Sequence, residues 1–198
     1  MPDSTELAPL IRGLADTDPT RRAGAAAEIF RRGGELARAA TQGWLADTEL
    51  AACLVPGRDG LPKVTVGVAV APDTFDRIRT AGGLPRLANV PPDQDAKEFE
   101  LDFPNGARLD VLTTSAPGAP GAIARFLQKF GEGIQQIEMN VTDVDRATDI
   151  LRARFGLEPV YPATRAGADN TRVNFFLVTP PSGKKLLIEL VEENARKP

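Results

Sequence analysis

The sequence predicts an α+β protein in which two βαβββ modules form one curved eight-stranded sheet, preceded by a small α-helical segment. Two observations indicate this fold class. In the first 55 residues the apolar side chains have helical spacing, as at Leu7, Ile11 and Leu14. After residue 62 the chain becomes rich in β-type segments, and the order of strand, helix and three strands occurs twice.

The chain divides into a helical segment, a linker and a β-rich domain. The helical segment, residues 1–55, is similar to one HEAT-type helical pair, and a Pro/Gly-containing linker follows at 56–62. The β-rich domain is expected at 63–192, with module one at 63–114, a connecting helix at 121–131 and module two at 134–192. One helical pair cannot bury its apolar face alone. We therefore expect the segment to pack on the rest of the chain, on a protein partner or on a second copy of itself.

Local signals define the expected elements. The first helix covers residues 6–14, and the second begins at Pro19, with Asp18 as its N-cap, and ends at Gly33-Gly34. Asn105-Gly106 is a strong signal for a β-hairpin. The expected strands are 63–70, 84–90, 98–103, 107–113, 134–141, 158–163, 172–179 and 184–191. The other expected helices are 72–80, 122–130 and 143–155.

The composition argues against several classes of partner. The net charge is -3, so the chain lacks the basic footprint of a nucleic-acid-binding protein. No apolar run approaches the roughly 18 residues of a membrane span, and the N-terminus has no secretory signal pattern. The single Cys53 rules out an internal disulfide and is typical of a reducing compartment. We expect a cytoplasmic protein that binds neither nucleic acid nor membrane.

The chain contains no histidine. Imidazole is the commonest transition-metal ligand and the commonest general base near neutral pH. A tetrahedral zinc site of the Cys/His kind therefore cannot be built from this sequence. Any acid–base chemistry has to use carboxylates, amides, hydroxyls, lysines, Tyr161 or Cys53.

Three segments carry a resemblance to a known family. Residues 126–151, FLQKFGEGIQQIEMNVTDVDRATDIL, resemble the central segment of methylmalonyl-CoA epimerases, members of the vicinal oxygen chelate (glyoxalase) superfamily. The segment GKKLLIELVE at 183–192 resembles the last strand of that family, and VTVGVAVAPDTFDRI at 64–78 resembles its opening strand and helix. The resemblance implies a glyoxalase-type domain and does not extend to the helical segment.

The resemblance also implies a metal site at Thr65, Asp110, Gln136 and Glu189. Thr65 and Gln136 stand where the family has histidines, and Gln135 replaces the histidine before the second of them. Asp110 takes the place of a Glu or Gln, and Glu189 is retained. Oxygen ligands alone disfavour zinc and suit Mg, Mn or Ca. We therefore expect either no cofactor or one of these hard divalent metals.

Strand alternation adds Glu138 to the candidate site. If Gln136 faces the sheet cleft, Glu138 faces it too, because side chains two residues apart share a face. Asp110, Glu138 and Glu189 are therefore the candidate catalytic residues, as carboxylates for proton transfer next to a carbonyl. Alternatively, Glu138 pairs with a nearby Arg or Lys and carries no chemistry.

Three functions remain open. The first is a protein with a degenerate metal site that binds a small organic or acyl-CoA-type ligand in the sheet cleft. The second is an active epimerase, isomerase or lyase that uses an oxygen-only divalent metal or a carboxylate pair. The third is an interaction module, in which the helical segment docks a protein partner and the β-rich domain is a scaffold. The resemblance also implies a homodimer.

Overall fold

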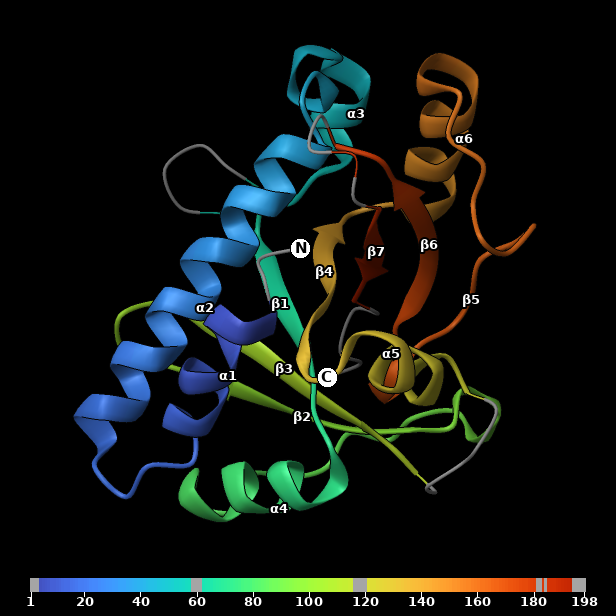
Figure 1. Cartoon of the computed structure of the whole chain (residues 1–198). Coiled ribbons are helices and arrows are strands. Elements are labelled where there is room, and N and C mark those ends of the chain that lie inside the picture. The colour runs from blue at the N-terminus through green and yellow to red at the C-terminus, as the bar shows by residue number, and fades with distance from the viewer. Residues whose placement is uncertain (1–3, 58–61, 116–120, 181–182, 184, 194–198) are drawn as a thin grey trace, which may run out of the picture. The chain divides into compact units, whose positions relative to one another are not determined.

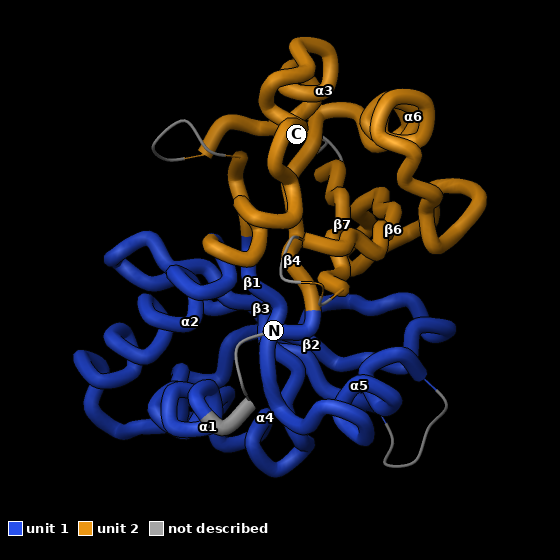
Figure 2. Tube along the Cα trace, turned by 45° about the horizontal axis from the view of Figure 1, so that its top comes forward, with its two compact units in different colours: residues 1–34, 65–135 blue, residues 35–64, 136–198 orange. Residues whose placement is uncertain are grey.

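The computed structural model describes residues 4–57, 62–115, 121–180, 183 and 185–193 (Figure 1). The chain forms two compact units, each described by itself below: unit 1 comprises residues 1–34 and 65–135, and unit 2 comprises 35–64 and 136–198 (Figure 2). No helix in the described residues is long and apolar enough to cross a membrane. The domain boundaries expected at residues 55 and 62 stay a prediction.

The described residues contain six α-helices and seven strands. The helices are α1 (Ser4–Gly13), α2 (Pro19–Ala40), α3 (Thr48–Cys53), α4 (Pro72–Ala81), α5 (Ala122–Phe130) and α6 (Val144–Phe155). The strands are β1 (Val64–Ala69), β2 (Ala96–Asp102), β3 (Arg108–Thr114), β4 (Gly133–Val141), β5 (Arg165–Ala166), β6 (Arg172–Val178) and β7 (Leu186–Glu192). Helix α2 and strand β4 both continue across the boundary between the units. The α+β class is therefore confirmed.

The strands of the two units follow the same topology. In unit 1, β3 pairs with β1 in parallel and with β2 in antiparallel orientation. In unit 2, β7 pairs with β4 in parallel and with β6 in antiparallel orientation, and β6 pairs with the short β5. In each unit the first long strand is thus parallel to the last one.

The expected eight-strand count is wrong for the described residues. Residues 84–90 form no strand: Leu84 has a positive φ of 59°, and Pro85 has no backbone N–H for a strand partner. Residues 158–163 form only a bridge between Pro159 and Phe176, and β5 begins later, at Arg165. Prolines interrupt both segments, so the β-rich composition there does not produce paired strands.

Other local expectations are confirmed. Helix α2 begins at Pro19, and the side chain of Asp18 accepts a hydrogen bond from the Thr20 amide (2.8 Å). Strands β2 and β3 form the predicted hairpin, with the Gly106 amide donating to the Phe103 carbonyl (2.8 Å). Helix α6 ends at Gly156, whose φ of 62° favours glycine.

The expected end of α2 at Gly33-Gly34 is wrong, because the helix continues to Ala40. Gly33 allows α2 to approach β1 closely: a Cβ added there would lie only 2.4 Å from Cγ2 of Val66. Gly34 has nothing within 4 Å of such a Cβ. Thus one glycine of the pair is required by packing, and neither ends the helix.

The two units hold their N-terminal helices in different ways. In unit 1 the apolar side chains of α1 and α2, such as Leu7, Ile11 and Ile29, are fully buried. In unit 2, Arg154 of α6 is hydrogen-bonded to Asp47 (2.7 Å) and to Glu49, the N-cap and first turn of α3. The helical segment of residues 1–55 therefore contributes to the packing of both units.

Candidate functional site

In unit 2, one face of the sheet is mostly apolar, and the other combines polar and apolar side chains. Helix α6 covers the apolar face, where Ile137, Phe176 and Ile188 are fully buried. The opposite side chains of the same strands form what we call the polar face of unit 2. It includes Gln136, Glu138, Asn140 and Glu189 together with apolar residues such as Phe175 and Leu187, because side chains alternate along a strand and paired residues point to the same side.

Three residues from the predicted site meet on this face. Glu138 and Glu189 are Cα partners in the parallel pair of β4 and β7. The side-chain amide of Gln136 donates to Oε2 of Glu189 (2.6 Å) and makes a longer contact with Oε1 of Glu138 (3.3 Å). Gln136 and Glu189 are only 6% and 9% exposed, so this hydrogen bond is shielded from water.

Further along the same face, Asn140 donates to Oε1 of Glu193 (3.0 Å), and the Lys63 ammonium reaches the same oxygen (2.9 Å). The Glu193 side chain is 63% exposed, so this carboxylate lies close to water. The face thus contains two amide–carboxylate pairs, one buried and one near solvent.

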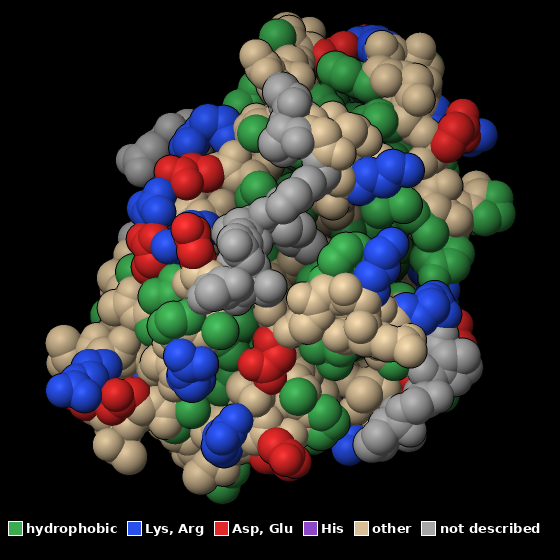
Figure 3. Space-filling model, in the orientation of Figure 1, with side chains coloured by type: hydrophobic (Ala, Val, Ile, Leu, Met, Phe, Trp, Pro, Cys, Tyr) green, Lys and Arg blue, Asp and Glu red, His purple; other side chains and the backbone are tan. Residues whose placement is uncertain are grey.

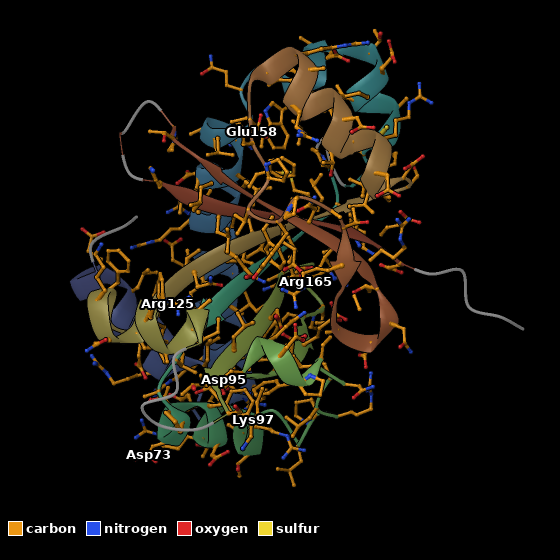
Figure 4. All side chains as sticks on the ribbon, turned by 90° about the vertical axis from the view of Figure 1, so that its right-hand side faces the viewer. Asp73, Asp95, Lys97, Arg125, Glu158 and Arg165 are labelled. Atoms are coloured by element: carbon orange, nitrogen blue, oxygen red, sulfur yellow. The ribbon has the colours of Figure 1, made fainter. Side chains whose placement is uncertain are left out.

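An aromatic pair adjoins the carboxylates. Phe175 is the antiparallel partner of Glu189, and the ring of Tyr161 contacts the ring of Phe175 edge-on (centroids 5.9 Å apart). The guanidinium of Arg165, labelled in Figure 4, lies 4.5 Å from the Tyr161 ring centroid. Phe175 and Arg165 were not predicted, since no motif marks them, and Tyr161 was named only among the side chains left for acid–base chemistry. Alternation along 172–179 together with the register of β6 on β7 would have identified Phe175.

The candidate residues of unit 1 lie on one face of its sheet. Gly67 is the Cα partner of Asp110, and Thr65 lies two residues before Gly67 on the same face of β1. Thr65 and Asp110 are both buried, 3% and 4% exposed. One end of this face is covered by α5, where Ile123 packs against Ala69 and Leu112.

The structure therefore brings Gln136, Glu138 and Glu189 together, while Thr65 and Asp110 share a face of the other unit. Within the described residues, no three His, Cys, Asp or Glu side chains are grouped so that they could hold a metal ion. The donor set of unit 2 does not fit a metal as it stands. Gln136 turns its amide nitrogen, which cannot coordinate a cation, toward Glu189.

Cys53 is the other candidate for chemistry, and its surroundings oppose that role. The side chain is buried, and burial raises the pKa of the thiol above its ordinary value. A buried thiol of high pKa is a poor nucleophile. Cys53 is therefore a packing residue of α3.

Two surface hollows lie away from these faces. One is in unit 2 beside α3 and α6 and is lined by Glu49, Asp145 and Arg154, among others. The other is in unit 1 between the start of α2 and the β2–β3 hairpin, where Leu14 and Phe103 line it. On the face drawn in Figure 3, positive and negative side chains are interspersed, without a continuous basic patch.

The fold is similar to that of solved methylmalonyl-CoA epimerases. The Mycobacterium tuberculosis epimerase matches at 32% identity over 67% of this chain and 87% of its own, with a TM-score of 0.55. A variant of the Streptomyces coelicolor epimerase in complex with 2-nitronate-propionyl-CoA matches at 25% identity over 66% of this chain and 96% of its own (TM-score 0.52). A hypothetical protein from Bacillus halodurans shares the fold at 23% identity over 68% of this chain and 95% of its own (TM-score 0.53). No family model matches the sequence, and a comparison with curated proteins finds no match.

Proposed function

The chain belongs to the glyoxalase (vicinal oxygen chelate) superfamily, and from that premise we propose that it binds a small organic or acyl-CoA-type ligand at the polar face of unit 2. The observation that carries the proposal is the hydrogen-bonded group of Gln136, Glu138 and Glu189. Small-molecule sites combine apolar walls with a few well-placed polar groups. Phe175 beside Glu189 supplies the apolar wall.

The type of ligand is inferred from the neighbours. The Streptomyces coelicolor epimerase forms a complex with 2-nitronate-propionyl-CoA, an acyl-CoA analogue. In this chain, the side-chain oxygen of Gln136 can accept a hydrogen bond from a ligand N–H or O–H, and the rings of Phe175 and Tyr161 offer a surface for an apolar acyl group.

In this proposal the metal site is degenerate. Its four positions, Thr65, Asp110, Gln136 and Glu189, contain no imidazole. A hard cation such as Mg, Mn or Ca would require the Gln136 amide to turn its oxygen toward Glu189. Ligand binding in this proposal uses no metal.

An alternative is an enzyme that moves a proton next to a carbonyl. The observation in its favour is the adjacent placement of two carboxylates, Glu138 and Glu189, on one face. One carboxylate would remove a proton from the carbon next to the carbonyl, and a second acid would return a proton. Asp110 of unit 1 is a further candidate for acid–base chemistry. A homodimer, and a protein partner for the helical segment, also stay predictions.

The proposal is tested by calorimetric titration of chelator-treated protein with methylmalonyl-CoA, propionyl-CoA and free CoA. We expect heat of binding with at least one acyl thioester, and at least tenfold weaker binding to the Glu189→Gln variant, since the Glu189 carboxylate accepts the hydrogen bond that positions Gln136 and a hydrogen bond to a charged group contributes about 1.5–3 kcal/mol. Glu158→Gln is the matched control, because Glu158 is an exposed carboxylate of the same unit (labelled in Figure 4) and should not affect affinity. Equal affinities of the wild type and Glu189→Gln would contradict the proposal.

The enzymatic alternative has its own readout. In heavy water, an active epimerase exchanges the proton next to the thioester carbonyl for deuterium, which proton NMR detects. Exchange that stops in Glu138→Gln and Glu189→Gln while the ligand still binds would support the enzyme. Binding without exchange would support a ligand-binding protein.

A further inference from the structure

The parallel pairing of β4 with β7 puts two negative charges side by side. Glu138 and Glu189 are Cα partners on neighbouring strands, which are about 4.8 Å apart, and both side chains point to the polar face. Like charges directly opposite each other destabilise a sheet. A group of positive character close to both carboxylates therefore stabilises the arrangement.

The amide of Gln136 lies in that position. Its nitrogen is 2.6 Å from Oε2 of Glu189 and 3.3 Å from Oε1 of Glu138. A primary amide has two N–H hydrogens in one plane, so one can be directed to each carboxylate. Because Gln136 is 94% buried, the partial positive charge of its NH2 group acts with little screening by water.

A third carboxylate on the same face, that of Glu193, also accepts a hydrogen bond from a side-chain amide of β4. Near solvent, Glu193 receives both the Asn140 amide and the Lys63 ammonium, which is a full positive charge. The buried carboxylate of Glu189 receives an amide at the matching place, four residues earlier on β4. A neutral donor avoids the cost of desolvating a cation.

We infer that the Gln136 amide is a built-in substitute for a divalent cation, holding Glu138 and Glu189 together and closing this part of the site to metals. The inference rests on the degenerate metal site of the proposed function, but not on any organic ligand. It has a direct consequence: a metal-ligating side chain at position 136 should open the site to metal, because two carboxylates are already in place.

The test is a thermal-shift series on chelator-treated full-length protein with Mg, Mn, Ca, Co, Ni and Zn chlorides. The wild type should show no metal-dependent change in Tm. Gln136→His should gain at least about 5 °C with saturating Co, Ni or Zn, since a ligand at about 100 times its Kd raises the Tm of a chain this size by several degrees. Gln136→Glu should instead respond to Mn or Mg. The double variant Gln136→His/Glu189→Gln is the matched control and should lose most of the shift.

Two outcomes would overturn the inference. A wild-type shift that Glu189→Gln abolishes would mean that the amide already turns its oxygen to a bound cation. Folded Gln136→His and Gln136→Glu variants with no response to any metal would mean that the amide does not stand at a cation position. If Gln136→His fails to fold, the metal responses of the wild type and of Gln136→Glu test the inference. Failure to find an organic ligand would contradict the proposed function and leave this result unaffected.

Discussion

The two units pair their first and last strands in the same register, yet the side chains on their polar faces differ. In unit 1 the Cα partner of Asp110 is Gly67, and in unit 2 the Cα partner of Glu189 is Glu138. Gly67 has no side chain, so at this register position β1 places nothing beside Asp110. In unit 2, β4 places a second carboxylate there.

The two units also differ at the residue two positions before Gly67 on β1 and before Glu138 on β4. It is Thr65, with a short hydroxyl, in unit 1 and Gln136, with a long amide donor, in unit 2. The amide is present where two carboxylates are Cα partners and absent where the Cα partner of the carboxylate is glycine. The two units thus share the strand register, which the fold requires. The polar side chains at the matching positions differ, and they differ according to whether one or two carboxylates are present.

The largest effects should come from the apolar faces, each of which contains a fully buried phenylalanine. Phe99 in unit 1 and Phe176 in unit 2 are fully buried, so Phe99→Ala and Phe176→Ala should each lower the free energy of unfolding by about 3–5 kcal/mol. Since α2 and β4 run through both units, urea denaturation followed by circular dichroism should give one transition. Phe130 is half-exposed, so Phe130→Ala should lower the free energy of unfolding by less than about 1 kcal/mol and is the control. Two separate transitions would show that the units unfold independently.

A pair of double-mutant cycles measures the difference between the polar faces. Gln136→Leu and Glu189→Leu should show a coupling energy of about 1.5–3 kcal/mol, the range for a hydrogen bond to a charged group. Thr65→Val and Asp110→Leu form the matched cycle in unit 1 and should couple by less than about 0.5 kcal/mol. Chemical denaturation of all variants gives both values. Similar coupling energies for the two pairs would contradict the conclusion that only unit 2 has a strong hydrogen bond between these positions.

The adjacent Gln135 should respond in the opposite direction. It is 7% exposed, and its Oε1 has no hydrogen-bond partner in the described part of the chain. An unsatisfied buried polar atom costs about 1–3 kcal/mol, so Gln135→Leu should raise the free energy of unfolding by about 1 kcal/mol. Gln136→Leu should lower it. Differential scanning calorimetry measures the stability of the two variants. A loss of stability in both would contradict the placement of Gln135 and Gln136 on opposite faces of β4.

The smallest effect concerns the ion pairs of unit 2 and depends on pH. Hydrogen bonds from Arg154 hold the pKa values of Asp47 and Glu49 below their ordinary values. Carboxylates with a lowered folded-state pKa stabilise above their unfolded-state pKa, near 4, and this contribution is lost as the pH falls further. Arg154→Met should therefore have a lower Tm than the wild type at pH 7, and the gap should close as the pH falls below about 4. Arg152→Met, at a more exposed ion pair, is the control. A gap that is constant with pH would contradict the electrostatic explanation.

Local signals in the sequence were sufficient for much of the fold. The Asn105-Gly106 hairpin and the end of α6 at Gly156 are set by backbone conformations that few residues adopt. The family resemblance put Thr65 and Gln136 at its two histidine positions and Asp110 and Glu189 at its carboxylate positions. The structure contains the same register in both units, and alternation along β4 correctly put Glu138 on the face of Gln136.

The remaining features depend on contacts between distant residues. Gly33 looks like a helix end in the sequence, and only the approach of Val66 explains why it lies inside α2. For the expected strand at 84–90, Pro85 was a warning in the sequence, but the positive φ of Leu84 was not visible there. Tyr161 belongs to the candidate site because its ring contacts Phe175. This contact depends on how residues 158–164 lie beside β6, where the Val160 amide donates to the Phe175 carbonyl.

The order in which the chain visits the two units has a consequence for its synthesis. Residues 35–64 belong to unit 2, but the rest of that unit begins only at residue 136. When α3 leaves the ribosome, its partner α6 is still about a hundred residues from completion, a delay of roughly 5–20 s at the usual rates of translation. During that interval Trp44 and Leu50, both buried in the finished protein, have no completed unit to pack into. The nascent chain is therefore most exposed to aggregation or to chaperone binding at this early helical stretch, while unit 1 is the first part that can fold.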